Sequence, residues 1–319
     1  MILLTEAGVG QPAKTIAIFG AGLIGEATAR ALGRHAALCR DIFPLDWSNA
    51  ERQERQLAAL ESKLTEALVE AANASPCVDL LWSAGRAGFG AGLGETTHEL
   101  ASFQAVLALA VRLAASSPGA RIIFHLISSA GGLFEGQRQV DCRAVAAPRR
   151  PYSLLKQRQE ELLAAAPIAS RVYRLSSVYG FVRPGQRIGL ISILLLNGLR
   201  HRVTHINGRM STLRDFVFAE DIADFLARAI LVDIALAAHP VILAHGKPTS
   251  IWEIQRLIES VIGRRIYLSY SLMPENSEDS TFSPAVLPSG WRPSDLASNI
   301  RRIYHEALRS GAAFSQPQR

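Results

Sequence analysis

A glycine-rich turn between a predicted strand and a predicted helix is the feature that most constrains the fold. Residues 15–19 are an apolar run that predicts a buried strand, and residues 23–33 predict the helix that follows it. Gly20 and Gly22 lie between the strand and the helix, and Gly25 lies in the first turn of the helix, so the three have the spacing G-x-G-x-x-G. In this setting the first glycine permits the turn, the second lets the backbone approach a pyrophosphate, and the third lets strand and helix pack closely.

The start of this helix offers hydrogen-bond donors to an anion. The N–H groups of Leu23 and Ile24 lie in the first turn, where they lack intrahelical partners and the helix dipole is positive. Asp41 follows a second predicted strand, where a carboxylate accepts hydrogen bonds from the ribose 2′-OH of NAD. The neighbouring Arg40 suits the 2′-phosphate of NADP instead. The sequence therefore favours NAD and leaves NADP open.

Strands and helices alternate along the first 180 residues, with further apolar strands predicted at 78–82, 121–127 and 171–175 and helices at 51–72, 97–115 and 151–166. This alternation is typical of an α/β fold with a Rossmann-type, doubly wound parallel sheet. Beyond residue 180 the elements shorten, which indicates a smaller C-terminal substrate-binding lobe. The predicted organisation is an N-terminal extension at 1–13, a dinucleotide-binding Rossmann domain at 14–180, and a mainly substrate-binding lobe at 181–319, of which 216–244 returns to the sheet.

Composition excludes several classes of protein. The net charge of +6 is spread as scattered arginines, which does not favour a nucleic-acid partner. Three cysteines without CxxC spacing predict neither a disulfide framework nor a metal site. The first residues lack a basic segment, and no run approaches 18 uninterrupted apolar residues. We therefore expect a cytoplasmic protein without a membrane partner.

Two side chains with the potential for proton transfer lie four residues apart. Tyr152 and Lys156 share one face of a predicted helix, so a phenol and an ammonium lie close together. A phenol ordinarily titrates near pH 10, so its use near neutrality needs roughly 4 kcal/mol of stabilisation of the anion. An ammonium and a positively charged nicotinamide ring are two sources of it. Ser128 and Ser129 end the strand at 121–127, at the edge where open α/β sheets bind ligands.

The order of these motifs resembles that of the extended short-chain dehydrogenase/reductases, the NAD-dependent epimerase/dehydratase family of sugar-nucleotide enzymes. The segments that carry the resemblance are Ser83–Gly85, Pro151–Lys156, Arg174–Gly180, Arg214–Asp221, His245–Glu253 and Gly290–Pro293. It implies that Tyr152 and Lys156 act with a serine in catalysis and also contact the cofactor. It further implies that Ala84 and Gly85 bind cofactor, that Ser177 and Arg214 bind a nucleotide-diphosphate sugar, and that the protein forms a homodimer.

Some positions depart from the family pattern. Phe19 replaces the first glycine of the usual GxxGxxG turn, and Ser177 replaces an asparagine often found near the diphosphate. Alignment on Phe134 places Ala130 at the catalytic Ser/Thr position, whereas a slip of one residue restores Ser129 to that role. No arginine-x-glycine-aspartate segment occurs near residues 271–285.

Three hypotheses follow from these residues. The first is an NAD(P)-dependent nucleotide-sugar epimerase, which transiently oxidises a sugar hydroxyl by hydride transfer with Tyr152 and Lys156 as acid-base pair. The second is an NADPH-dependent reductase of a keto sugar or other carbonyl, which uses the same residues. The third is a non-catalytic nucleotide-binding protein, although binding alone requires neither side chain.

Overall fold

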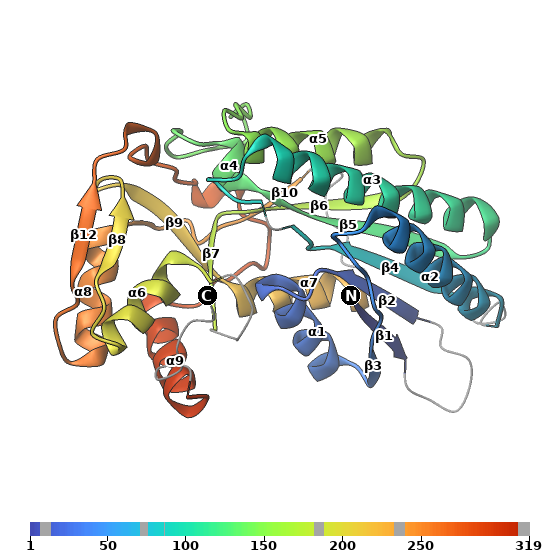
Figure 1. Ribbon diagram of the computed structural model, residues 1–319, viewed down its shortest axis with the longest axis horizontal. Helices are drawn as coiled ribbons and strands as arrows, with labels where there is room; N and C mark the ends of the chain where they lie inside the picture. Colours follow the sequence, from blue (N-terminus) through green and yellow to red (C-terminus); the bar gives the residue numbers. More distant parts are fainter. Residues whose placement is uncertain (7–13, 71–75, 86, 182–187, 233–239, 312–319) are drawn as a thin grey trace. The chain divides into compact units, whose positions relative to one another are not determined.

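The computed structural model describes residues 1–6, 14–70, 76–85, 87–181, 188–232 and 240–311 (Figure 1). Most of the predicted N-terminal extension, residues 7–13, therefore lies outside the described residues. The chain forms two compact units. The first comprises Met1–Leu133, Pro148–Arg174 and Ala223–Val241, and the second comprises Phe134–Ala147, Leu175–Ile222 and Ile242–Arg319.

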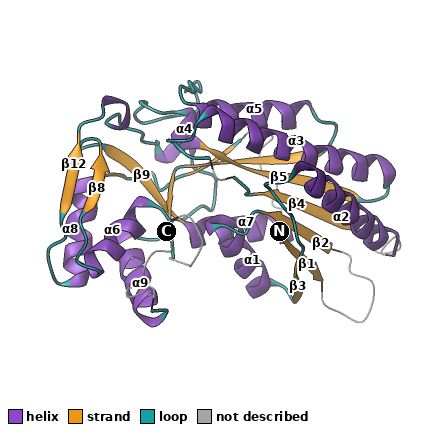
Figure 2. Cartoon of the chain, in the orientation of Figure 1, coloured by secondary structure: helices purple, strands orange, loops and turns teal. Residues whose placement is uncertain are grey.

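A seven-stranded, mostly parallel sheet forms the centre of the first unit (Figure 2). Its strand order is β10-β6-β5-β4-β2-β1-β3. Its strands are β1 (Ile2–Glu6), β2 (Lys14–Phe19), β3 (Leu38–Ile42), β4 (Cys77–Trp82), β5 (Arg121–Ser129), β6 (Ala169–Leu175) and β10 (Val241–Leu243). Strands β2, β4 and β5 run parallel, so their carboxyl ends lie at one edge of the sheet. The predicted α/β class is confirmed.

Strand β1 was not predicted from the sequence. It lies between β2 and β3 and is antiparallel to both, with Ile2 opposite Ile18 on one side and Ile42 on the other. Leu3 and Leu4 are buried, as expected for an interior strand with both faces covered. In the usual strand order the partners of β2 would be β3 and β4. The insertion therefore moves β3, and Asp41 on it, one strand further from the glycine turn.

Helices cover both faces of this sheet. In Figure 1, α2, α3 and α5 lie on one face and α1 and α7 on the other. Their bounds are α1 (Leu23–His35), α2 (Ala50–Glu70), α3 (Leu93–Ser116), α4 (Ala130–Leu133), α5 (Pro151–Ala165) and α7 (Ala219–Leu231). The helix predicted from residue 51 is confirmed in α2, on which Leu57, Leu60, Leu64 and Leu68 form a buried apolar stripe.

Helix α3 packs against the sheet in the core of the first unit. By length and composition it is the one helix in the described part of the chain that could cross a membrane. Its side chains Phe103, Val106 and Leu113 are buried in the same apolar cluster as Trp82 and Phe124 of the sheet. It begins four residues before the predicted start, where the Glu95 carboxylate accepts the N–H of Gly92 at 3.1 Å.

The described residues of the second unit form two small sheets and three helices longer than one turn. One sheet has the order β11-β9-β7 and the other pairs β12 with β8. The bounds are β7 (Ser177–Tyr179), β8 (Thr204–Asn207), β9 (Leu213–Phe218), β11 (Pro248–Ser250), β12 (Leu268–Ser271), α6 (Leu190–Leu199), α8 (Ile251–Ile262) and α9 (Leu296–Arg309). An apolar cluster that includes Phe216, Ile254 and Ile303 forms its core. The segment between β12 and α9 contains two short 3₁₀ turns, Pro274–Asn276 and Pro284–Val286.

Candidate active site

The glycine turn after β2 is shaped by two different requirements. Gly20 has a φ of +102°, and a Cβ there would lie 2.6 Å from the backbone of Ala84. A Cβ on Gly25 would lie 1.9 Å from the carbonyl oxygen of Gly20. The packing of the unit itself therefore requires these two glycines. A Cβ on Gly22 would meet no described atom within 4 Å, so the space beside it remains open for a ligand.

The ends of β2 and β4 are held together beside this space. Ser83 Oγ can donate to the carbonyl oxygens of Phe19 at 3.1 Å and Gly20 at 3.0 Å, which fixes the turn at Ala84 and Gly85. Gly22 is the N-cap of helix α1 and offers no side-chain hydrogen bond to it. The first backbone N–H groups of α1, at Leu23 and Ile24, are therefore available to a pyrophosphate. The cradle fits a dinucleotide.

The structure gives the candidate ribose-binding residues different environments. Arg40 donates two hydrogen bonds to the carboxylate of Glu26, at 2.8 Å and 3.0 Å. This ion pair engages the guanidinium that could otherwise bind a 2′-phosphate. The side chain of Asp41 is 65% exposed and lies 3.9 Å from Lys63, with β1 between its strand and β2.

Ser129 and Tyr152 both approach the Cα of Gly132. A Cβ on Gly132 would be 3.2 Å from Ser129 Oγ and 3.3 Å from Tyr152 Cε1. The Gly132 N–H donates to Ser129 Oγ at 3.0 Å, which orients the hydroxyl at the end of β5. The structure therefore brings the hydroxyl of Ser129 and the phenol ring together. This geometry favours Ser129 over Ala130 as the hydroxyl-bearing partner of Tyr152.

The neighbouring Ser128 has a different partner. Its hydroxyl donates to the carboxylate of Glu160, which also accepts hydrogen bonds from the Arg174 guanidinium, the shortest at 2.6 Å. Ser128 and Arg174 are thus joined to α5 through one carboxylate. We assign this arrangement to the support of the site rather than to chemistry.

Tyr152 is half-buried at the start of α5, which has proline at its first position. Its ring lies 5.6 Å from that of Phe89, centroid to centroid, and the Arg150 guanidinium lies 5.3 Å from the Phe89 ring. Lys156 Nζ lies 5.8 Å from the centroid of the Tyr152 ring, on the helix face that the spacing predicts.

Glu99 is a site residue that the sequence reasoning missed. Its Oε1 accepts a hydrogen bond from Lys156 Nζ at 3.1 Å, and both side chains are less than a tenth exposed. Lys156 also donates to Gln159 Oε1 at 3.0 Å. The available signal was periodicity, because Glu99 shares the buried apolar face of α3 with Phe103 and Val106, at positions i, i+4 and i+7.

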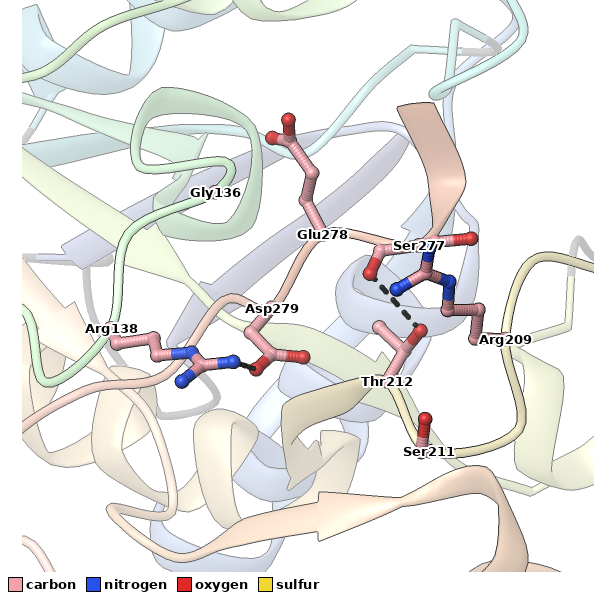
Figure 3. A pocket seen from close by; sticks show the side chains of 8 residues that line it. All are labelled: Gly136, Arg138, Arg209, Ser211, Thr212, Ser277, Glu278 and Asp279. Atoms are coloured by element: carbon pink, nitrogen blue, oxygen red, sulfur yellow. Dashed lines mark hydrogen bonds and ion pairs between the residues drawn. The ribbon is translucent and has the colours of Figure 1, made fainter. Parts of the chain in front are cut away.

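The second unit contains a polar pocket of about 310 Å³ (Figure 3). Its lining residues are Gly136, Arg138, Arg209, Ser211, Thr212, Ser277, Glu278 and Asp279. Arg138 forms an ion pair with Asp279 at 2.7 Å, and Asp279 also accepts the N–H of Leu213 at 2.7 Å. The exposed Arg209 places a second guanidinium at the wall of the pocket.

The two predicted substrate residues also lie in this unit. Arg214 is half-buried on β9, next to Leu213, and donates to the carbonyl oxygen of Asn276 at 3.3 Å. Ser177 is half-buried on β7 and lies opposite Phe216 in the parallel pairing with β9. Arg209 and Arg138 were not singled out from the sequence, because their convergence depends on loops that are distant in the chain.

Comparison with known proteins identifies the family. The model of the NAD dependent epimerase/dehydratase family matches residues 16–235, which is more than half of the chain. The chain belongs to this family, whose members include enzymes of the short-chain dehydrogenase/reductase type.

Individual relatives are distant. A putative UDP-glucose 4-epimerase from Methanocaldococcus jannaschii is 29% identical over 197 residues, which span 57% of this chain and 61% of the relative. The UDP-glucose 4-epimerase of Thermus thermophilus, solved with NAD, has a TM-score of 0.71 and 17% identity, covering 91% of this chain and 97% of its own. RMD from Pseudomonas aeruginosa, solved with NADPH, has a TM-score of 0.68 and 16% identity, covering 93% and 99%. These structures share the fold.

Proposed function

We propose that this protein is a nucleotide-sugar epimerase that uses a tightly held NAD. The observation that carries the proposal is the approach of Ser129 Oγ and the Tyr152 ring to the same point beside Gly132, in the unit that also contains the dinucleotide cradle. Bound NAD supplies a hydride acceptor that can return the hydride to the same substrate. Membership of the family and the likeness to UDP-glucose 4-epimerases support this reading.

The side chains of the first unit have complementary roles. Tyr152, as phenolate, accepts the proton of a sugar hydroxyl when the carbon that bears it is oxidised, and donates it back after the keto sugar has presented its other face. Ser129 Oγ donates a hydrogen bond to the same sugar oxygen, because Gly132 N–H occupies its acceptor side. Lys156 stabilises the phenolate and contacts the cofactor.

NAD is the preferred cofactor in this proposal, with NADP as the alternative. Glu26 neutralises Arg40 through two hydrogen bonds, so a 2′-phosphate would have to compete with a carboxylate that is already in place. The preference rests on this ion pair, because β1 separates the strand of Asp41 from β2 and the glycine turn.

The second unit supplies the groups for the nucleotide diphosphate. We assign Arg214 and Ser177 to the substrate and add Arg209, whose guanidinium lines the polar pocket. Arginine suits this task because its planar fork binds phosphate oxygens in pairs. A UDP-sugar is the first substrate to test, because the UDP-glucose 4-epimerase of Thermotoga maritima, at a TM-score of 0.70 and 18% identity, was solved with UDP-glucose.

The deciding experiment identifies what the purified protein carries. The protein is denatured, and released nucleotides are identified and quantified by mass spectrometry against its concentration. Near-stoichiometric NAD is expected, because a cofactor that is regenerated in each cycle has no reason to leave. The native protein is then incubated with UDP-glucose and UDP-galactose, and the epimers are followed by NMR. An empty protein that binds NADPH preferentially and consumes it with a keto sugar would instead establish a reductase.

A further inference from the structure

The carboxylate of Glu99 binds two parts of the first unit at once. Its Oε1 accepts from Lys156 Nζ at 3.1 Å and from Gln159 Nε2 at 3.4 Å. Its Oε2 accepts the backbone N–H of Ala87 at 3.3 Å. A Cβ on Gly85 would lie 2.6 Å from the same carboxylate. Glu99 thus connects the candidate catalytic lysine with the turn that follows β4.

The burial of this pair gives it an energetic consequence. The side chains of Lys156 and Glu99 are 8% and 6% exposed, so water screens their interaction poorly. A buried ammonium without a partner would be costly, and the carboxylate offsets that cost. It also adds a negative charge close to the cation that is expected to stabilise the Tyr152 phenolate.

We propose that Glu99 is a positioning residue of the active site, which holds the Lys156 ammonium in place and offsets its charge so that the Tyr152 phenol ionises at higher pH than beside an unpaired lysine. This inference rests on the proposed function only in the role given to Tyr152. Glu99 is a third ionisable group, on α3, in addition to Tyr152 and Lys156, and its carboxylate offsets the positive charge of Lys156.

The other charged groups near the phenol act in defined ways. Arg150, at the start of α5, lies over the ring of Phe89, which is tilted against the ring of Tyr152, and the charge of Arg150 is unchanged in the variants below. Glu160, one turn beyond Lys156 on α5, is matched by Arg174. From α4 and β5, Gly132 and Ser129 contribute no charge. Glu99 is therefore the group on a neighbouring helix whose charge can be changed without altering these pairs.

A charge series at two neighbouring positions tests the proposal. Glu99→Gln removes the carboxylate while it keeps the shape and an acceptor oxygen. Gln159→Glu adds a second carboxylate beside Lys156 with equally small change in shape. The double variant moves the carboxylate from α3 to α5 and restores the wild-type total charge. Each protein is titrated by the near-ultraviolet absorbance of phenolate, with the matching Tyr152→Phe variant subtracted to isolate the signal of Tyr152.

The expected order follows from the charges. Glu99→Gln lowers the midpoint of the Tyr152 titration by about one pH unit, Gln159→Glu raises it by a similar amount, and the double variant returns it close to the wild-type value. Identical midpoints across the series would overturn the proposal, even if the variants differ in thermal stability. If one variant fails to fold, the remaining variants still show whether an added carboxylate raises, or a removed one lowers, the midpoint of the Tyr152 titration.

The measurement separates this inference from the proposed function. The titration needs neither a substrate nor turnover, so shifted midpoints would support the role of Glu99 even in a protein that fails to epimerise UDP-sugars. Conversely, an active epimerase with unshifted midpoints would keep the proposed function and remove Glu99 from it. In an active enzyme, the acid limb of the pH–rate profile must move in the same order as the titrations.

Discussion

His125 Nε2 lies 2.8 Å from Asp79 Oδ1 inside the central sheet, and both side chains are buried. Asp79 also forms an ion pair with Lys14 at 3.2 Å, and His125 Nδ1 lies 3.1 Å from the hydroxyl of Tyr173. These four residues come from β2, β4, β5 and β6, so a row of polar side chains crosses four neighbouring strands. Burial raises the pKa of the Tyr173 phenol and keeps it a neutral hydroxyl.

This row predicts that acid destabilises the protein through Asp79. Burial alone would raise the pKa of this carboxyl, but the hydrogen bond from His125 and the charges of His125 and Lys14 lower it below its ordinary value. Because the pKa of Asp79 is lower in the folded than in the unfolded state, its ionised carboxylate stabilises the protein above about pH 4. That stabilisation is lost as the pH falls through the pKa of the folded state. Asp79→Asn should cost about 3 kcal/mol at pH 7, because it leaves Lys14 and His125 without their anion.

Denaturant unfolding from pH 7 to pH 3 provides the measurement. The difference between the wild type and Asp79→Asn should shrink as the pH falls below 4, since the wild type then loses the same charge. A difference that stays constant over this range would show that the ionised carboxylate contributes nothing.

The two kinds of glycine in the turn predict opposite phenotypes. Gly25→Ala should fail to fold or lose more than about 3 kcal/mol of stability, because its Cβ would lie 1.9 Å from a backbone oxygen. Gly22→Ala should lose no more than about 1 kcal/mol, since its Cβ meets no described atom within 4 Å. It should nevertheless weaken NAD binding about tenfold by filling the space for the pyrophosphate. Thermal unfolding and calorimetric titration with NAD measure both effects, and unchanged NAD affinity in Gly22→Ala would remove the cradle assignment.

Glu26 predicts cofactor selectivity. In Glu26→Gln the Arg40 guanidinium loses its ionic partner and becomes available to a 2′-phosphate. The affinity for NADP should therefore rise several-fold, while that for NAD changes less than about twofold. The control is Glu26→Gln combined with Arg40→Gln, in which the gain should disappear. A gain that survives in the double variant would locate selectivity elsewhere.

The adjacent serines provide a matched test of catalysis. Ser129→Ala and Tyr152→Phe should each lower kcat about 10²-fold or more while NAD remains bound, because each removes a polar group at the proposed sugar oxygen. Ser128→Ala should cost about 1 kcal/mol of stability and leave kcat within about twofold, since its hydroxyl donates to Glu160 instead. Steady-state kinetics on a UDP-sugar measure these effects on kcat. Equal losses of kcat in the two serine variants would contradict the assignment of Ser129.

Local patterns in the sequence predict the elements that depend on local periodicity. The buried runs of β2, β4 and β5, and the leucine stripe of α2, could be identified because burial leaves a regular apolar repeat. The face shared by Tyr152 and Lys156 follows from helix geometry alone. These features required no knowledge of distant contacts.

The remaining features depend on pairing between segments that are far apart in the chain. The segment 2–6 is too short for its sequence to show which strands it pairs with, so β1 could not be placed from the sequence. The partner of Glu99 is 57 residues away on α5, and a single carboxylate on an apolar helix face does not reveal it. Arg40 was weighed only against a cofactor phosphate, whereas the fold brings it to Glu26.

The position of β1 also constrains how the protein can be assembled during synthesis. This strand leaves the ribosome before β2 and β3, yet it is bonded to both, and its register with β3 extends to Ile42. Its five residues must remain unpaired on that side until β3 has been made, with buried leucines exposed meanwhile. The pairing of β1 on both sides is therefore complete only after Ile42 has been made, so β1 couples the folding of β2 to that of β3.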